Sequence, residues 1–258
     1  SGAGAGRGAQ AAGRAVGLMA AFDNPNLAIL ELVAQALGPV CERVIFVGGC
    51  ATGLLLTQER PDRIRITEDV DIVAQALTVH DYHAIEKQVR AQGFSNDMRP
   101  GAPICRWVYK NVTLDLMPTV KDILGFANRW YPLALESAQP VVLPSGINIQ
   151  LIAAPAFIGT KLEAFKDRGK DANGKPDYLG SHDLEDIITV ADRRPELLAE
   201  CQVAAPELRA YFAAEFTALF SDPEFEQALS GHLPGDAFSQ QRAKPLAHTL
   251  RELTKLSY

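Results

Sequence analysis

The sequence predicts an α+β protein, in which a small mixed β-sheet flanked by helices is followed by a helical C-terminal part. Up to about residue 152, short apolar runs and alternating segments indicate strands between helices. Beyond that point the apolar residues recur at helical spacing throughout. We therefore expect a flexible N-terminal segment at 1–20, an α/β core at 21–152 and a mostly helical C-terminal domain at 153–258.

The core is expected to begin with a helix and then a buried strand. Asn24-Pro25 is a helix-start pattern, with Asn as N-cap and Pro as the first helical residue, and helical spacing continues to Gly38-Pro39. The apolar run Val44–Val47 follows and stops at Gly48-Gly49, before a helix-compatible stretch from Ala51 to Leu56. A strand, a glycine turn and a helix start let backbone N–H groups approach a phosphate closely.

A polar connection between Thr57 and Ile64 leads to a segment in which acidic and aliphatic residues alternate, Asp69-Val70-Asp71-Ile72-Val73. Residues i and i+2 of a strand share a face, so Asp69 and Asp71 point together away from the core. Two like charges about 7 Å apart repel each other unless a cation lies between them. A hard divalent ion with oxygen ligands is the natural candidate.

Caps and turns predict the remaining elements. Thr78 and Asp81 form a capping box that opens a helix to about Gln92. Two hairpins are expected, one from the strands Ile104–Tyr109 and Asn111–Met117 and one from Val141–Leu143 and Ile147–Leu151. Further helices are expected at Pro155–Lys166, from Ser181 to before Pro195, and at Pro206–Phe220, Pro223–Leu229 and Lys244–Leu256.

Asp115 is a candidate for a third acid, because it lies on the polar face of its strand between the inward-facing Leu114 and Leu116. A phosphate-binding turn beside paired carboxylates suggests phosphoryl or nucleotidyl transfer. Nucleotidyl transfer uses two metal ions roughly 3.5–4 Å apart. Asp69 and Asp71 would bridge both Mg²⁺ ions, and Asp115 would hold the ion on the side of the attacking hydroxyl. Mg²⁺ keeps several waters, so three carboxylates together with phosphate oxygens suffice as ligands.

These residues resemble a known family. Gly48-Gly49, the spaced Asp69-x-Asp71 and Asp115 resemble the DNA polymerase β-like nucleotidyltransferase superfamily. The stretches from Lys161 to Arg168 and from Ser181 to Ile187 are similar to the AbiEii/MenT branch of bacterial toxin-type nucleotidyltransferases. The resemblance covers about residues 43–192 and implies a nucleotidyltransferase-like mixed sheet.

The resemblance implies transfer of a nucleoside monophosphate from an NTP to an acceptor hydroxyl or phosphate, with release of pyrophosphate. It further implies two Mg²⁺ ions (or Mn²⁺ in their place), tRNA or another acceptor, and a cognate antitoxin. The catalytic residues would be Asp69, Asp71, Asp115, Lys161 and Asp183, the first three as metal ligands. Nucleotide binding would fall to Gly48, Gly49, Thr52, Arg65, Thr67, Arg168 and Asp186.

One position departs from the family pattern. Many superfamily members carry a serine directly after the second glycine, where this chain has Cys50. A thiol is a weak hydrogen-bonding group. Phosphate contact at this point would therefore come from a backbone N–H or from Thr52.

Each pattern also has a simpler interpretation. Gly48-Gly49 is compatible with an ordinary strand-to-helix turn, the acids with a solvated strand face, and Lys161 with a surface lysine. Asp183 near a helix N-terminus is stabilised by the helix dipole whatever its function. The alternatives in function are a protein or small-molecule nucleotidyltransferase, and a nucleotide-binding module without catalysis.

Composition narrows the classes of function. A net charge of −6 argues against nonspecific nucleic-acid binding and disfavours tRNA as acceptor. The chain has no apolar stretch near the roughly 20 residues that a membrane helix needs. Its four widely spaced cysteines indicate reduced thiols, so we expect a cytoplasmic protein with no membrane partner.

Overall fold

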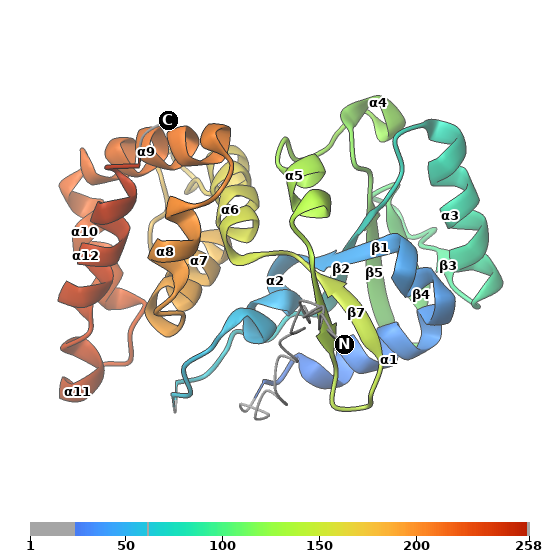
Figure 1. Ribbon diagram of the computed structural model, residues 1–258, viewed down its shortest axis with the longest axis horizontal. Helices are drawn as coiled ribbons and strands as arrows, with labels where there is room; N and C mark the ends of the chain where they lie inside the picture. Colours follow the sequence, from blue (N-terminus) through green and yellow to red (C-terminus); the bar gives the residue numbers. More distant parts are fainter. Residues whose placement is uncertain (1–23, 61, 257–258) are drawn as a thin grey trace, which may run out of the picture.

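The computed structural model describes residues 24–60 and 62–256, so the expected flexible segment at 1–20 lies outside the described residues. Within them, seven strands form one sheet with the order β3-β4-β5-β2-β1-β7-β6 (Figure 1). The sheet is mixed, because β2 runs parallel to β5 and β1 parallel to β7, whereas the other neighbours are antiparallel. The strands are β1 Val44–Val47, β2 Asp69–Ala74, β3 Ser95–Asn96, β4 Arg106–Tyr109, β5 Val112–Met117, β6 Gln139–Val142 and β7 Asn148–Leu151.

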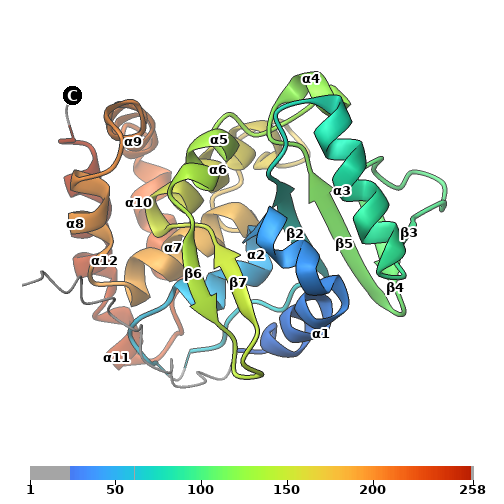
Figure 2. The same cartoon turned by 45° about the vertical axis from the view of Figure 1, so that its right-hand side comes forward.

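The helices fall into two groups along the chain. α1 Leu27–Leu37 and α3 Val79–Ala91 lie against the sheet (Figure 2), and the Tyr82 hydroxyl of α3 donates a hydrogen bond of 2.7 Å to the carbonyl of Leu116 in β5. The helices from α6 on lie beside the sheet. The other helices are α2 Gly48–Ala51, α4 Lys121–Leu124, α5 Tyr131–Glu136, α6 Ala154–Arg168, α7 His182–Arg193, α8 Leu197–Gln202, α9 Pro206–Phe220, α10 Pro223–Gly231, α11 Ala237–Gln240 and α12 Ala243–Leu253.

The mixed α+β architecture and both hairpins are confirmed. The β4–β5 turn passes through Lys110, whose φ is 52°, and the β6–β7 turn through Gly146, whose φ is 84°. The capping box is also confirmed, because the Thr78 hydroxyl accepts a hydrogen bond from the Asp81 N–H at 3.1 Å. All four cysteines are free and buried.

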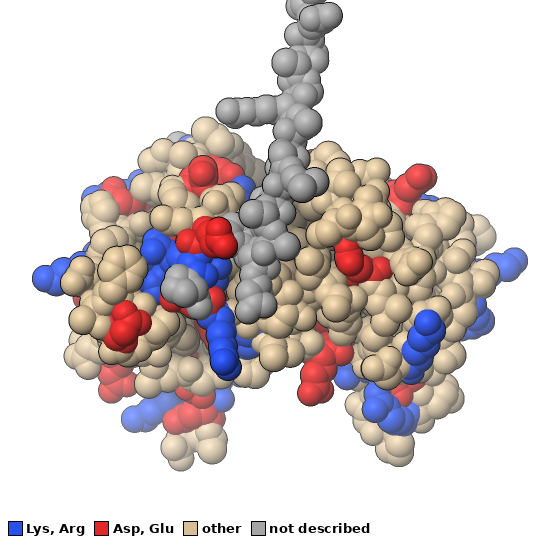
Figure 3. All heavy atoms as spheres, turned by 90° about the horizontal axis from the view of Figure 1, so that it is seen from below, with Lys and Arg blue, Asp and Glu red and all other residues tan. Residues whose placement is uncertain are grey.

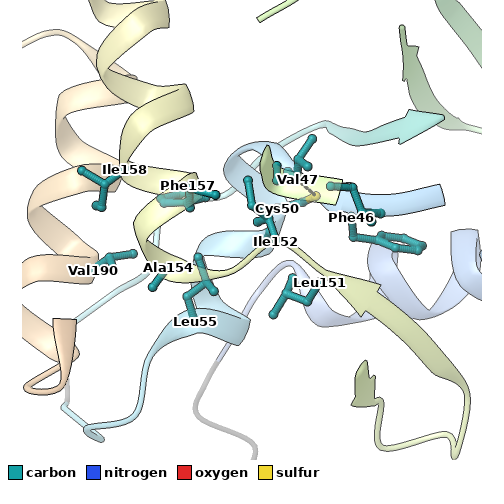
Figure 4. Close-up of a cluster of buried hydrophobic side chains, with 14 of the residues drawn as sticks. Phe46, Val47, Cys50, Leu55, Leu151, Ile152, Ala154, Phe157, Ile158 and Val190 are labelled. Atoms are coloured by element: carbon teal, nitrogen blue, oxygen red, sulfur yellow. Dashed lines mark hydrogen bonds between the residues drawn. The ribbon is translucent and has the colours of Figure 1, made fainter. Parts of the chain in front are cut away.

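A single apolar cluster joins the sheet to the C-terminal helices (Figure 4). Phe46 of β1, Phe157 of α6 and Val190 of α7 are each fully buried within it. The expected domain boundary at 152/153 falls between β7 and α6, inside this shared core. Because packed interiors deform little, α6 is held in a fixed position relative to β1.

Several expected boundaries are wrong. α1 begins at Leu27, because the Asn24 side chain accepts a hydrogen bond from the Asn26 N–H (3.0 Å) and so closes a turn ahead of the helix. The strand expected from Ile104 begins at Arg106, whose N–H donates to the Pro103 carbonyl in a turn.

Other differences concern short elements and helix ends. The helix expected at Ala51–Leu56 is instead α2, which starts at Gly48 and continues into the 3₁₀ turn Thr52–Leu55. The last helix runs from Ala243 to Leu253 rather than from 244 to 256. The sequence gives no signal for the short elements, since two to six residues are too few to display a period: β3, α4, α5, α8 and α11.

Asn26 fastens α1 to the segment that leads into β2. It is fully buried, and its side chain is not used as a helix cap. Its amide nitrogen Nδ2 donates to the Arg65 carbonyl at 2.8 Å, and its Oδ1 accepts from the Thr67 N–H at 2.9 Å. One side chain thereby satisfies two backbone groups of a segment that belongs to no helix or strand.

We predict that Asn26→Ala lowers the free energy of unfolding by roughly 1–3 kcal/mol, because it leaves buried backbone groups without partners. Urea unfolding measures the change. The control is Asn173→Ala, which alters an exposed loop residue and should stay within about 0.5 kcal/mol of the parent. Equal losses in the two variants would contradict the role given to Asn26.

Candidate active site

The three acids meet because of strand register. Asp71 of β2 is the Cα partner of Asp115 in β5, and Asp115 is in turn the partner of Arg106 in β4. Residues directly opposite each other on paired strands share a face of the sheet. Asp69 lies two residues before Asp71 on the same face, whereas Val70 and Ile72 are fully buried in the core, as expected.

The two glycines let the β1–α2 turn pass close to the acidic strand. Gly48 has a φ of 71°, and a Cβ at this position would lie only 1.8 Å from Oδ2 of Asp71. A Cβ at Gly49 would lie 2.4 Å from Nη2 of Arg65 and 3.3 Å from Oδ2 of Asp186. Gly48 therefore requires glycine, because its φ and the Asp71 side chain both exclude a Cβ, whereas a side chain at Gly49 would have to displace Arg65.

Lys161 is buried, with 6% of its surface exposed, so it is not a solvated surface lysine. It lies on α6, and its Nζ is 3.1 Å from Oδ1 of Asp183 and 2.7 Å from Oδ2 of Asp186, both on α7. Burial lowers the pKa of Lys161, but Asp186 and Asp183 outweigh it and raise the pKa above its usual value. Lys161 is therefore held as an ammonium between two carboxylates.

Two arginines extend this arrangement into an ionic chain. The guanidinium of Arg168 forks onto Asp183, with Nε–Oδ2 at 2.7 Å and Nη2–Oδ1 at 2.9 Å. Nη2 of Arg65 lies 2.8 Å from Oδ2 of Asp186. Burial alone would raise the pKa of Asp183, yet Arg168 and Lys161 hold it below its ordinary value. We call Arg168, Asp183, Lys161, Asp186 and Arg65 the ionic chain.

Two cavities adjoin at the acids. The first, of about 660 Å³, is lined by Gly48, Lys161 and Arg168 together with side chains from residues 119–132. The second, of about 730 Å³, is lined by Asp69, Asp115 and Arg65, among others. Residues that line both cavities are Asp71, Met117, Phe126, Lys161, Arg168 and Asp183. The second acid of the Asp-x-Asp motif thus stands between two spaces, each large enough for a small molecule.

Three of the expected nucleotide-binding residues line the second cavity: Gly49, Arg65 and Thr67. Asp186 lines neither cavity and contacts Lys161 and Arg65 instead. Thr52 also lines neither; it is 1% exposed, and its hydroxyl finds no hydrogen-bond partner among the described residues.

Cys50 is directed into the core. The Cys50 thiol donates to the Val47 carbonyl at 3.4 Å, and burial raises its pKa. Cys50 therefore lines neither cavity, whereas the preceding Gly49 lines the second.

Arg106 is a site residue that the sequence analysis missed. Its Nε and Nη2 lie 2.8 and 2.6 Å from the two carboxylate oxygens of Asp115, and Nη2 is 3.4 Å from Oδ2 of Asp69. A signal for it exists, because a turn at Lys110-Asn111 pairs Tyr109 with Val112 and hence Arg106 with Asp115.

Tyr131 lines the first cavity and is 8% exposed. It lies in the short helix α5, for which the sequence has no comparable signal. The residues between β5 and α6 that help to shape this cavity were therefore absent from the sequence-based site.

The acids fit a divalent cation through Asp69 and Asp71. Among the described residues, no three acidic, His or Cys side chains form a ready-made metal-binding group, and the carboxylate of Asp115 faces Arg106. The pKa of Asp71 is raised to about 7, first by burial and then by the charges of Asp69 and Asp115. A hard cation at this point would offset the repulsion from Asp69 and Asp115, which adds to the effect of burial on this pKa.

Comparisons with known proteins add no family assignment. No family model matches the chain, and no curated protein matches it. Among the described residues, no helix is both long and apolar enough to cross a membrane. Function is therefore inferred from the geometry and charge of the site.

We predict that Asp71→Asn stabilises the metal-free protein at pH 8 and that this stabilisation disappears as the pH falls to about 4 and below. Because folding raises the pKa of this carboxyl from 3.8 to about 7, the folded state binds the proton more tightly than the unfolded state. The contribution of Asp71 to stability therefore falls as pH rises from about 4 to about 7. Thermal unfolding in EDTA across this range should show the parent converging with the variant at low pH. A difference in melting temperature between parent and variant that stays constant across this pH range would contradict the raised pKa of Asp71.

We also predict that Lys161→Met lowers the free energy of unfolding by about 3–5 kcal/mol, since it leaves two buried carboxylates without their ammonium. The matched control on the same helix is Lys166→Met. Lys166 pairs with Glu215 at 2.6 Å but is about half exposed, so its loss should cost under about 1 kcal/mol. Urea unfolding at pH 7 compares them. Losses of similar size would show that the ion pairs of Lys161 contribute no more to stability than the exposed pair of Lys166.

Proposed function

We propose that this protein is a Mg²⁺-dependent nucleotidyltransferase, which moves a nucleoside monophosphate from an NTP to an acceptor hydroxyl or phosphate and releases pyrophosphate. The observation that carries the proposal is the position of Asp71, which lines both cavities, with Lys161 and Arg168 on the shared wall. Transfer between two substrates needs one space for the donor and one for the acceptor, with the reacting phosphorus between them.

The first cavity suits the donor. Lys161 and Arg168 bring two cations to it, and the Gly48 turn brings backbone close to Asp71. Fixed positive groups stabilise the charge that develops on the leaving pyrophosphate. Tyr131, Val120 and Pro132 supply apolar lining for a base or ribose.

The second cavity suits the acceptor, because Asp69 and Asp115 line it and do not line the first. In the reaction, the acceptor oxygen forms a bond to the α-phosphorus, its proton passes to a carboxylate, and the bond to the pyrophosphate oxygen breaks. Mg²⁺ held by Asp69 and Asp71 would neutralise the triphosphate and orient it for this attack. The carboxylates of Asp69 and Asp115 would orient the acceptor hydroxyl.

The distribution of charge bears on the chemical class of the acceptor. On the face seen in Figure 3, acidic and basic side chains are interspersed, without a broad basic surface. The net charge of −6 likewise gives no general attraction for RNA. The similarity of the stretches Lys161–Arg168 and Ser181–Ile187 to toxin-type enzymes favours tRNA as acceptor. Because the overall charge does not attract RNA, a tRNA acceptor would be bound through local contacts at the second cavity. A protein or small molecule is the alternative acceptor.

The experiment that tests the proposal incubates the protein and Mg²⁺ with each labelled NTP in turn. Separate reactions contain total cell RNA, cell protein and the small-molecule fraction of a lysate. Label in one fraction identifies both the NTP and the acceptor class. Binding of an NTP without label in any fraction would instead support a non-catalytic nucleotide-binding module.

We predict that Asp69→Ala and Asp71→Ala each reduce label transfer on the order of 100- to 1000-fold or more, as expected for loss of one electrostatic contact to the transition state. Glu42→Gln, an exposed carboxylate outside both cavities, is the control and should retain parental activity. Circular dichroism confirms that each variant is folded. Near-normal transfer by either aspartate variant would exclude the proposed mechanism.

A further inference from the structure

Arg106 occupies the place beside Asp115 where a cation is expected. Its guanidinium contacts both carboxylate oxygens of Asp115, at 2.8 and 2.6 Å, and one oxygen of Asp69 at 3.4 Å. The two residues are Cα partners across β4 and β5, so the pairing is set by strand register rather than by a mobile loop. A forked arginine–carboxylate pair is among the stronger ionic contacts in proteins.

This pairing has a consequence for metal binding. Asp115 is 7% exposed, and both of its oxygens are engaged by the guanidinium. A second divalent ion at Asp115 would have to displace the arginine, since two cations cannot share the same carboxylate face without repulsion. Arg106 contacts Asp69 at only one oxygen and at longer range. Among the described residues it forms no ion pair with Asp71, so the first ion can bind between Asp69 and Asp71.

We propose that Arg106 is an internal counter-cation of the third acid. In the donor-free protein it holds Asp115 away from metal, so the site takes one divalent ion through Asp69 and Asp71. A second ion binds only when the guanidinium releases Asp115. This inference rests on the proposed function, because it assigns the order in which the metal sites fill.

The surroundings of Arg106 allow such a release. Its side chain is 26% exposed and lines the second cavity, which has about 730 Å³ of space. Arg106 is therefore not enclosed by the core, and it can turn into this cavity without moving β4. The charge of Asp115 remains balanced in both states, by the guanidinium in one and by the metal ion in the other.

The test is a titration with Mn²⁺ alone, in which calorimetry measures the number of bound ions and their affinities. The parent should bind one ion with a second site much weaker. In Arg106→Gln the affinity of the second site for Mn²⁺ should rise on the order of 10- to 100-fold, because the ion no longer has to displace a charge-assisted contact. The control is Arg99→Gln, an exposed arginine that pairs with Asp97 and should leave both sites unchanged.

Thermal unfolding gives a second readout. In EDTA, Arg106→Gln should melt below the parent, because three carboxylates then face one another without the guanidinium. Mn²⁺ should raise the melting temperature of this variant more than that of the parent. A merely structural arginine would give a loss that Mn²⁺ does not restore. Arg106→Lys, which keeps the charge but cannot fork, should lie between the two and serves if Arg106→Gln does not fold.

The outcomes separate this inference from the proposed function. Equal Mn²⁺ affinities and stoichiometry in the parent and the Arg106 variants would overturn the inference, while label transfer by the parent would leave the proposed function standing. Absence of Mn²⁺ binding in every variant, with or without NTP, would overturn both.

Discussion

Repulsion among three carboxylates on neighbouring strands is the constraint on which the rest of the site depends. Asp69, Asp71 and Asp115 share one face of the sheet, and the pKa of Asp71 is raised first by burial and then by the charges of the other two acids. Arg106 of β4 compensates part of this charge at Asp115, and Lys161 and Arg168 of the ionic chain line the same cavity as Arg106. The glycine turn meets a second, steric requirement of the same acids, because Gly48 leaves the space that an Asp71 oxygen fills.

Position along the chain says little about which residues cooperate in this fold. The acids come from the sheet, whereas Lys161 and its partners come from α6 and α7, and α6 begins 37 residues after the end of β5 (154 − 117). The apolar cluster of Figure 4 makes this possible, since it continues from β1 into both helices. Packing of the fully buried Phe157 and Val190 helps to hold the ammonium of Lys161 in place relative to the acidic strand, together with the ion pair between Arg65 and Asp186.

Sequence alone predicts the parts of the site that depend on local periods. Alternation places Asp69 and Asp71 on one face. The two-residue turn also contains the register that brings Arg106 to Asp115, although Arg106 is absent from the sequence-based site. Sequence alone cannot predict the pairing of Lys161 with Asp183 and Asp186, because that contact depends on how two helices pack. The same limit applies to Thr52, because a helical pattern does not show that its side chain is buried in the core. It also applies to the short helix α5, which places Tyr131.

The ionic chain also has a consequence for the proposed binding of a triphosphate. With Glu185, whose Oε2 lies 3.7 Å from Nε of Arg65, its three cations are matched by three carboxylates. The cluster as a whole is therefore neutral before any nucleotide arrives. Under the proposed function, a bound phosphate would replace a carboxylate as the partner of Lys161 or Arg168, so the number of ionic contacts would change little. We therefore expect the affinity to come from shape and from contacts to the base and ribose, and to depend only weakly on ionic strength.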